Sequence, residues 1–196
     1  MNIQTCGGTT SDYPHRITVT GLSGVGTTSF CEALVKTLGE AWRHTTAGDA
    51  IRRIAESKGM AIEEFVEYCR SNPESDLEVD AETQAMGRVC QMMVFEGRLA
   101  HYNVPNAFHI LINCPPNVCA KRPRKNNQHL TETEREINLR ARDMHDNARY
   151  ERLYGREVLW SEDKYNLVLD SNFLRTEEMV NIAILEFSLW LYPEEE

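Results

Sequence analysis

Short apolar segments alternate with longer amphipathic segments along this chain. The short segments have the length and composition of buried strands, predicted at residues 16–21, 42–46, 92–95, 108–112 and 167–169. Apolar residues at helical spacing predict helices at residues 30–38, 49–57, 62–69, 77–89, 131–154 and 177–191. Pro115 and Pro116 open a further helix, because proline is tolerated in a first helical turn.

This alternation decides the fold class. Strands that alternate with helices favour a parallel sheet covered by helices on both faces, which is a three-layer α/β sandwich with five parallel strands. Thr131 and Glu134 have the spacing of a capping box and mark the start of the longest helix. Residues 1–15 are polar and are predicted to form a tail, and residues 16–193 are predicted to form a single domain without repeats or linkers.

Composition narrows the possible partners. The chain has 196 residues and a formal net charge of -9, and it has no apolar run long enough to cross a bilayer. Nucleic-acid binders need a basic face, so nucleic acid is not expected as a partner of this acidic chain. Without a long apolar run, a membrane is not expected as a partner either. Six scattered cysteines and a polar N-terminus without a signal sequence favour reduced thiols and a cytoplasmic location. A monomer is expected, since no amphipathic surface helix is left over.

A glycine-rich turn joins the first strand to the first helix. The segment GLSGVGTT at residues 21–28 nearly matches the Walker A pattern, whose backbone N–H groups and helix N-terminus cradle a triphosphate. ATP and Mg²⁺ are therefore the expected ligands, with Thr28 supplying a hydroxyl to the metal. The predicted ATP-binding residues of this loop are Gly21, Ser23, Gly24, Val25, Gly26, Thr27, Thr28 and Ser29.

One position of the loop departs from the pattern. Thr27 stands where the pattern has a lysine, which normally contacts the outer phosphates as a point charge. Threonine cannot supply that charge. Lys36 lies about two and a half turns further along the helix and is not expected to replace it.

Further motifs give the chain a family resemblance. AGDAIR follows the second strand at residues 47–52, EGR ends the third strand at 96–98, and RDMHDNAR lies on the long helix at 142–149. With the loop, these motifs resemble those of the cytidylate kinases, especially the short archaeal-type members, from about residue 16 to residue 171. The resemblance implies the fold of P-loop nucleoside-monophosphate kinases, with helices that bind the monophosphate and a lid at about residues 122–131.

The resemblance also assigns roles to single residues. It implies that Arg52, Gly97 and Arg98 bind the acceptor phosphate, and that Glu96 lies near magnesium with Thr28. Arginine forks suit phosphate geometry and stay charged. On the long helix it implies that Arg142 grips phosphates, that Asp146 contacts the nucleoside sugar and that Arg149 holds the acceptor nucleotide. The alternative for this helix is a set of internal Arg–Asp pairs of minor energetic value.

The lid contributes charge of its own. Arg122 and Arg124 belong to a basic cluster that precedes the polar break at residues 126–128. Lids of this fold close over the donor, so both arginines are candidates for contacts with ATP, and they could partly replace the absent lysine. Arg98, Arg142 and Arg122 are the predicted catalytic residues, since phosphoryl transfer needs alignment and charge neutralisation.

Three functions stay open at this point. The first is transfer of the γ-phosphoryl group of ATP to a pyrimidine nucleoside monophosphate, CMP or dCMP. The second is a nucleotide-binding protein that no longer catalyses and acts as a sensor or assembly subunit, which Thr27 favours. The third is a kinase of the same fold with a different small phosphate acceptor. In each case the partners are small-molecule nucleotides.

Overall fold

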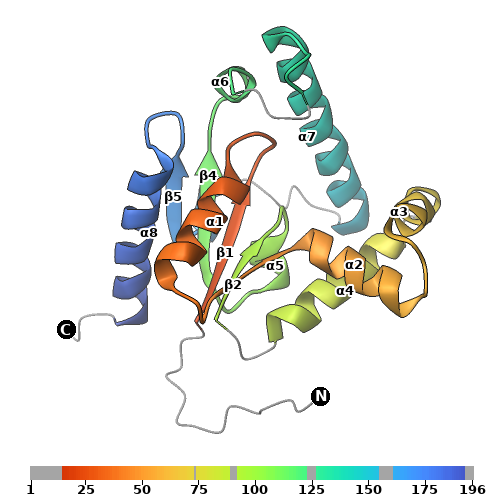
Figure 1. The fold of residues 1–196 in the computed structure, drawn as a ribbon, viewed down its shortest axis with the longest axis horizontal. Coiled ribbons are helices and arrows are strands. Elements are labelled where there is room, and N and C mark those ends of the chain that lie inside the picture. Colours follow the sequence, from red (N-terminus) through yellow and green to blue (C-terminus); the bar gives the residue numbers. More distant parts are fainter. Residues whose placement is uncertain (1–14, 73, 89–91, 123–126, 155–160, 193–196) are drawn as a thin grey trace, which may run out of the picture.

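A computed structural model of the chain describes residues 15–72, 74–88, 92–122, 127–154 and 161–192 (Figure 1). Its strands are β1 (Arg16–Gly21), β2 (Arg43–Thr46), β3 (Met93–Glu96), β4 (Phe108–Asn113) and β5 (Leu167–Asp170). Its α-helices are α1 (Thr27–Leu38), α2 (Ala47–Ser57), α3 (Ile62–Ser71), α4 (Ser75–Arg88), α5 (Ala100–Asn103), α6 (Pro116–Ala120), α7 (Glu132–Tyr154) and α8 (Thr176–Leu191), and a short 3-10 helix covers Glu162–Lys164.

The strands form one parallel sheet in the order β2-β3-β1-β4-β5 (Figure 1). Ile17 of the central strand β1 lies opposite Val94 of β3 on one side and Phe108 of β4 on the other. The predicted five-stranded parallel sheet is confirmed. Ligands of open parallel sheets bind outside the carboxyl ends of the strands, and here β1 and β3 end side by side, with Val19 opposite Glu96.

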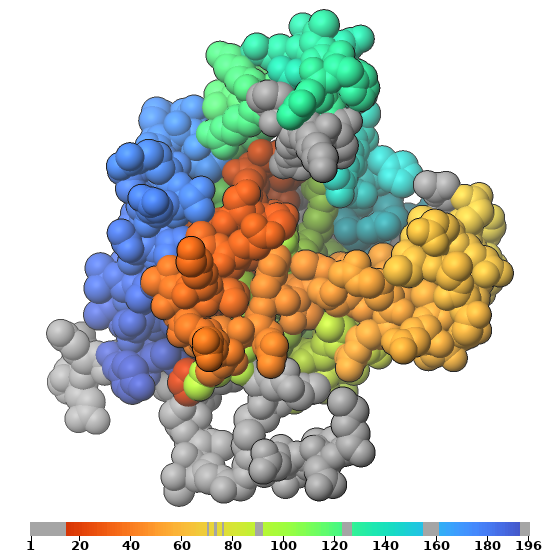
Figure 2. All heavy atoms as spheres, in the orientation of Figure 1, coloured from red at the N-terminus to blue at the C-terminus, as the bar shows by residue number. Residues whose placement is uncertain are grey.

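Helices cover both faces of this sheet. Successive side chains of a strand point to opposite faces, and Ile17 and Val19 point into the main core. There they meet Phe30 of α1 and Phe187 of α8, while Ala100 of α5 packs with residues of β3 in a second cluster. The predicted three-layer arrangement is therefore confirmed. In Figure 2, α2 and α3 project away from the layer formed by α1 and α8.

Several predicted boundaries are corrected by the structure. The first helix begins at Thr27, three residues before the predicted start, because the polar segment 27–29 hides its first turn from an apolar pattern. The third strand begins at Met93 and continues to Glu96, so the prediction of 92–95 is one residue early. The sequence pattern does not predict α5, because its 4 residues are too few to show a helical period.

Capping boxes set the start of two helices. The predicted box before α7 is confirmed, since the Thr131 amide donates to the Glu134 carboxylate and the Glu134 amide donates to the Thr131 hydroxyl. Thr46 and Asp49 form a second box at the start of α2, with the Thr46 amide 2.7 Å from Asp49 Oδ2. Each box satisfies N–H groups that have no partner within the helix.

Exposed residues and the lengths of the helices bear on the predicted oligomeric state and on the expected absence of a membrane partner. Leu185 and Leu189 of α8 are exposed beside the exposed polar residues Asn181 and Ser188, and the expectation of a monomer stays a prediction. Of the helices in the described ranges, none is both long enough and apolar enough to cross a bilayer. The predicted tail, apart from His15, and residues 123–126 of the predicted lid lie outside the described residues.

Candidate functional site

The loop between β1 and α1 has the backbone of a phosphate cradle. Gly24 and Gly26 have φ angles of 95° and 101°, a conformation that side-chain-bearing residues rarely adopt. A Cβ atom at Gly24 would also lie only 3.0 Å from Cβ of Cys119. Because α1 begins directly after Gly26, its unpaired N–H groups and positive dipole end face the concave side of the loop. The arrangement suits the anionic phosphates of a nucleotide.

Glu96, at the end of β3, joins this loop to the neighbouring strand. Its Oε1 atom accepts hydrogen bonds of 2.6 Å from Thr27 and 2.8 Å from Thr28, and its Oε2 atom lies 2.9 Å from Nε2 of His44. Burial raises the pKa of Glu96, but the hydrogen bonds from His44, Thr27 and Thr28 outweigh burial and hold the pKa below its usual value. Glu96 is therefore a carboxylate at neutral pH, and with the Thr28 hydroxyl it offers the hard oxygen ligands that Mg²⁺ prefers.

Arg98 connects the loop to the long helix α7. Its Nη2 atom donates to Asp143 Oδ1 at 2.7 Å and to the Ser23 hydroxyl at 2.5 Å, and its Nε atom lies 3.0 Å from Asp146 Oδ2. Asp143 in turn accepts a 3.0 Å hydrogen bond from the Ser23 amide. Among the described residues, the buried Nη1 atom of Arg98 has no hydrogen-bond partner. A guanidinium that keeps one buried donor unused is ready to bind a further anion.

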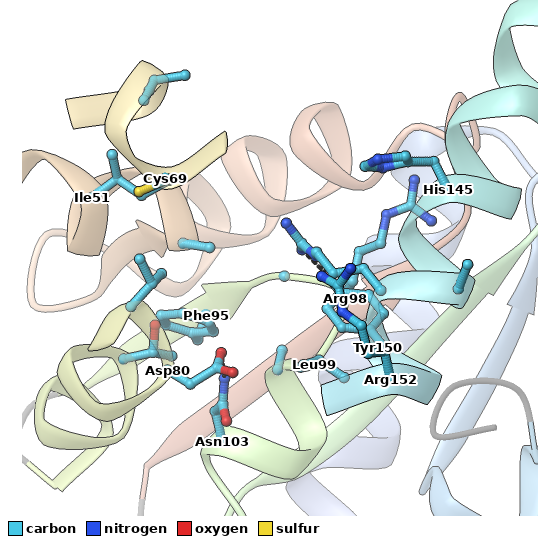
Figure 3. A pocket seen from close by; sticks show the side chains of 18 residues that line it. Ile51, Cys69, Asp80, Phe95, Arg98, Leu99, Asn103, His145, Tyr150 and Arg152 are labelled. Atoms are coloured by element: carbon cyan, nitrogen blue, oxygen red, sulfur yellow. Dashed lines mark hydrogen bonds between the residues drawn. The ribbon is translucent and has the colours of Figure 1, made fainter. Parts of the chain in front are cut away.

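A cavity of about 700 Å³ lies beside Arg98, bounded by β3 and the helices α2, α3, α4, α5 and α7. Figure 3 shows Arg98 and Tyr150 on one side of this space, with Asp80 and Asn103 side by side on the other. The cavity has the volume of a small-molecule site, and apolar side chains alternate with polar and charged ones along its walls.

The polar groups opposite Arg98 can form hydrogen bonds with the donors and acceptors of a bound ligand. The Asn103 amide donates a 3.0 Å hydrogen bond to Asp80 Oδ1, which fixes the orientation of both groups. The buried hydroxyl of Thr83 also lines the cavity and has no partner in the part of the chain that the structure describes. A carboxylate accepts hydrogen bonds, whereas a hydroxyl can donate or accept. A ligand with an exposed amino group would match this end of the cavity.

Basic side chains of α7 line another part of the cavity wall. Arg149 lies over the ring of Tyr150, with Cζ 4.7 Å from the ring centroid, and donates to its hydroxyl at 2.8 Å. Arg152 and His145 line the cavity from the same helix (Figure 3). An anionic ligand would therefore find Arg98 and Arg149 on one side of the cavity.

Arg122 is connected to the phosphate loop through Ser171. It donates to the backbone carbonyl of Ser171 at 2.5 Å and to its hydroxyl at 3.2 Å. The Ser171 hydroxyl donates in turn to the carbonyl of Val25 within the loop at 2.8 Å. Arg122 is thus linked to the phosphate loop through a single serine.

The structure brings together only part of the predicted site. Gly97, Arg98 and Arg149 line the cavity, and Asp146 forms an ion pair with Arg98. This contact joins α7 to the segment after β3, so pairs within α7 do not account for all the contacts of Asp146.

Other predicted residues lie outside the cavity lining. Arg52 is exposed and forms a 2.5 Å ion pair with Asp49, and Arg142 is exposed without an ion pair to another described residue. Ser29 is exposed on α1. The prediction for Arg124 falls outside the described residues.

Sequence reasoning missed other residues of the site. Asp143 lies inside the segment RDMHDNAR, but nothing in the pattern distinguishes it from Asp146. Asp80, Thr83 and Asn103 come from two separate helices, and no local spacing connects them. His44 precedes the second helix without any motif around it.

Comparisons with known proteins agree with this geometry. A family model described as an AAA domain matches residues 17–145. The cytidylate kinase of Pyrococcus abyssi is 36% identical over 157 residues, which cover 80% of this chain and 84% of that protein. The cytidylate kinase of Archaeoglobus fulgidus is 31% identical over 172 residues, 86% of this chain and 92% of that protein. Among solved structures, the shikimate kinase of Bacteroides thetaiotaomicron superposes with a TM-score of 0.58 at 15% identity, over 87% of this chain and 98% of that chain, which shows a shared fold.

Proposed function

The chain belongs to the cytidylate kinase family, and from this premise we propose that it transfers the γ-phosphoryl group of ATP to CMP or dCMP. Arg98 carries the proposal. Its guanidinium is bonded to Ser23 of the phosphate loop and also lines the neighbouring cavity, where Nη1 has no partner among the described residues. One arginine thus touches both the donor loop and the acceptor cavity, where a phosphoryl group would pass.

The donor side of the proposal rests on the loop. Residues 21–29 would hold the phosphates of ATP, and the oxygens of Thr28 and Glu96 would hold Mg²⁺. Mg²⁺ bound there would neutralise charge on the outer phosphates. Arg122, linked to the loop through Ser171, and Arg124 would approach the donor from the lid. They would add positive charge where Thr27 supplies none.

The acceptor side needs no general base. An oxygen of the acceptor phosphate is already anionic, so it can attack the γ-phosphorus directly while the bond to the bridging oxygen breaks and ADP leaves. Arg98 and Arg149 would hold that phosphate in line and neutralise the equatorial oxygens. Because Asp143 and Asp146 both bond to Arg98, the guanidinium would already be oriented before the nucleotides bind.

The roles proposed for three other residues depend on movement or on contacts made by bound ligands. Arg52 and Arg142 are exposed and would reach phosphates only when α2 and α7 close over the nucleotides. Asp146 would contribute by positioning Arg98, and it could contact the nucleoside sugar through its remaining lone pairs.

The far end of the cavity supports cytosine as the base. Cytosine presents an amino group that donates hydrogen bonds, and the Asp80 carboxylate accepts them. Uracil presents a carbonyl oxygen at the same place, which would face the carboxylate without a hydrogen bond. Asn103 holds the carboxylate in position, and the hydroxyl of Thr83 can bond to a ring nitrogen or carbonyl.

Two other functions keep an observation in their favour. Thr27 in the lysine position favours a protein that binds nucleotides without turnover. A different small phosphate acceptor would also fit, because 700 Å³ is larger than CMP requires. The same phosphate loop would serve all three functions, so only a turnover assay separates these two from a cytidylate kinase.

The test is direct phosphoryl transfer. The purified chain is incubated with Mg²⁺ and γ-labelled ATP, and CMP, dCMP, UMP, dTMP, AMP and GMP are offered separately. We expect label in CDP or dCDP, and an Arg98→Ala preparation made in the same way shows whether a contaminating kinase contributes. ATP binding without label in any diphosphate would overturn the proposal in favour of the non-catalytic protein. Label from another phosphate ester alone would favour a different acceptor.

A further inference from the structure

Three side chains of different chemistry meet behind the phosphate loop. Cys31 Sγ, a ring nitrogen of His44 and a carboxylate oxygen of Glu96 all lie within 4.8 Å of one another. Cys31 comes from α1, His44 from β2 and Glu96 from β3. Thr46 lies opposite Glu96 in the paired strands, and His44 is two residues before Thr46, so both side chains lie on the same face of the sheet.

This combination of ligands is typical of zinc sites. Thiolate, imidazole and carboxylate are the three groups that bind Zn²⁺ in proteins, whereas Mg²⁺ takes oxygen ligands and keeps water. Two ligands of a tetrahedral zinc ion lie about 3.5 Å apart. The observed separations therefore need only small side-chain rotations, and a water molecule could complete the coordination.

The surroundings of Cys31 and Glu96 fit a cation. Cys31 is fully buried and makes no hydrogen bond to another described residue, and its Sγ atom lies within 4.8 Å of a Glu96 carboxylate oxygen. A bound cation would remove the proton and stabilise the thiolate beside the carboxylate.

We propose that Cys31, His44 and Glu96 bind a divalent cation of the zinc type directly behind the phosphate loop. Glu96 directs Oε1 to Thr27 and Thr28 and Oε2 to His44, so the ion would occupy the side of the carboxylate that faces away from the loop. The Glu96 carboxylate would then lie between the bound ion and Thr27, which occupies the position of the Walker A lysine.

The test uses Co²⁺, which replaces Zn²⁺ in such sites and absorbs light. The metal-free full-length chain is titrated with Co²⁺ in the presence of excess Mg²⁺. We expect one Co²⁺ per chain and a thiolate-to-cobalt charge-transfer band, because Mg²⁺ competes weakly for sulfur and nitrogen ligands. The band should disappear in Cys31→Ser and stay in Cys114→Ser, a matched control at another buried free cysteine.

A second variant protects the test against misfolding. His44 is partly exposed, so His44→Gln should keep the fold, which circular dichroism checks, and should also lose the band. Absence of the band in the wild-type chain would overturn the proposal, as would an unchanged band in folded Cys31→Ser or His44→Gln. The outcome is independent of phosphoryl transfer, because Co²⁺ binding is measured without nucleotide and the kinase assay is run with Mg²⁺ alone.

Discussion

The hydroxyl of Thr27 donates a 2.6 Å hydrogen bond to Oε1 of Glu96, at the position where the Walker A pattern has a lysine. The adjacent Thr28 hydroxyl donates to the same oxygen at 2.8 Å. Two neutral hydroxyls thus connect the first turn of α1 to the end of β3. A lysine at position 27 would place a cation beside this carboxylate, which already has hydrogen bonds from Thr28 and His44. Thr27 therefore links α1 to the end of β3, although it does not supply the positive charge of the Walker A lysine.

Removal of the Thr27 hydroxyl should destabilise the loop. Thr27→Val keeps the shape of the side chain but removes one hydrogen bond to a largely buried carboxylate. We expect the free energy of unfolding to fall by about 1.5–3 kcal/mol, the usual contribution of a hydrogen bond to a charged group. Urea denaturation measures the change. Thr37→Val is the control, because its exposed hydroxyl donates to the Ala33 carbonyl of the same helix. Equal losses in the two variants would contradict a special role for Thr27.

Arg98 should be needed for both stability and turnover. Arg98→Ala leaves Asp143 and Asp146 without their cation in a region where all three side chains are mostly buried. We expect a loss of roughly 3 kcal/mol in the free energy of unfolding and a fall in kcat/KM of at least about 100-fold. Arg98→Lys should recover only part of the activity, because a lysine cannot bond to Ser23, both carboxylates and a phosphate together.

Arg140 provides the comparison for Arg98. It lies on α7 and pairs with Glu136 of the same helix at the surface. Arg140→Ala should change the free energy of unfolding by less than about 0.5 kcal/mol and should leave kcat/KM unchanged. If Arg98→Ala behaves like Arg140→Ala in the two measurements, Arg98 does not join the loop to the acceptor cavity.

Asp80 should decide between cytosine and uracil. Asp80→Asn keeps an oxygen that can accept the Asn103 hydrogen bond, but it adds an NH₂ group that can donate to the carbonyl of uracil. We expect the ratio of kcat/KM for CMP to kcat/KM for UMP to fall at least about tenfold, the value of one hydrogen bond. Glu82→Gln on the same helix is the control, since Glu82 pairs with Arg53. An unchanged ratio in Asp80→Asn would place the base elsewhere.

Local sequence signals predict most of the fold. The predicted strands match the five strands of the described sheet to within one residue at each end. Short apolar runs identify β1, β3 and β4, because strands in the middle of a parallel sheet are buried on both faces, whereas the edge strand β2 has the sequence RHTT and contains no apolar residue. The capping box at Thr131 and Glu134 marks the start of α7 for the same local reason. By contrast, α5 leaves no periodic signal, and the first turn of α1 is composed of the hydroxyl residues of the loop.

The site could be predicted only where a motif is contiguous. The loop and the segment EGR are local, so their residues were identified from the sequence. The partners of Arg98 depend on how α7 crosses the loop, which sequence spacing does not specify, and Asp143 was therefore missed. Asp80 of α4 and Asn103 of α5 lie side by side in the cavity wall through tertiary packing alone.

Partly buried His109 should make stability depend on pH. Its Nδ1 atom lies 2.7 Å from the Thr18 hydroxyl and its Nε2 atom 3.3 Å from the Pro105 carbonyl, an arrangement that the neutral ring satisfies. Burial lowers the pKa of His109 from its usual 6.5, and the hydrogen bond to Pro105 only partly opposes this. The unfolded chain therefore takes up this proton first as the pH falls below about 6.5, which favours unfolding.

Protonation of His109 should lower the free energy of unfolding as the pH falls. The contribution of His109 is fully present above about pH 6.5 and is lost as the pH falls through the lower folded-state pKa, while most carboxylates titrate below about pH 4.5. Urea denaturation between about pH 7.5 and 5.5 should show a decreasing free energy of unfolding. His109→Gln should flatten this decrease, whereas His129→Gln, at an exposed position, should keep it. A decrease of the same size in His109→Gln and the wild-type chain would show that His109 is not the group responsible.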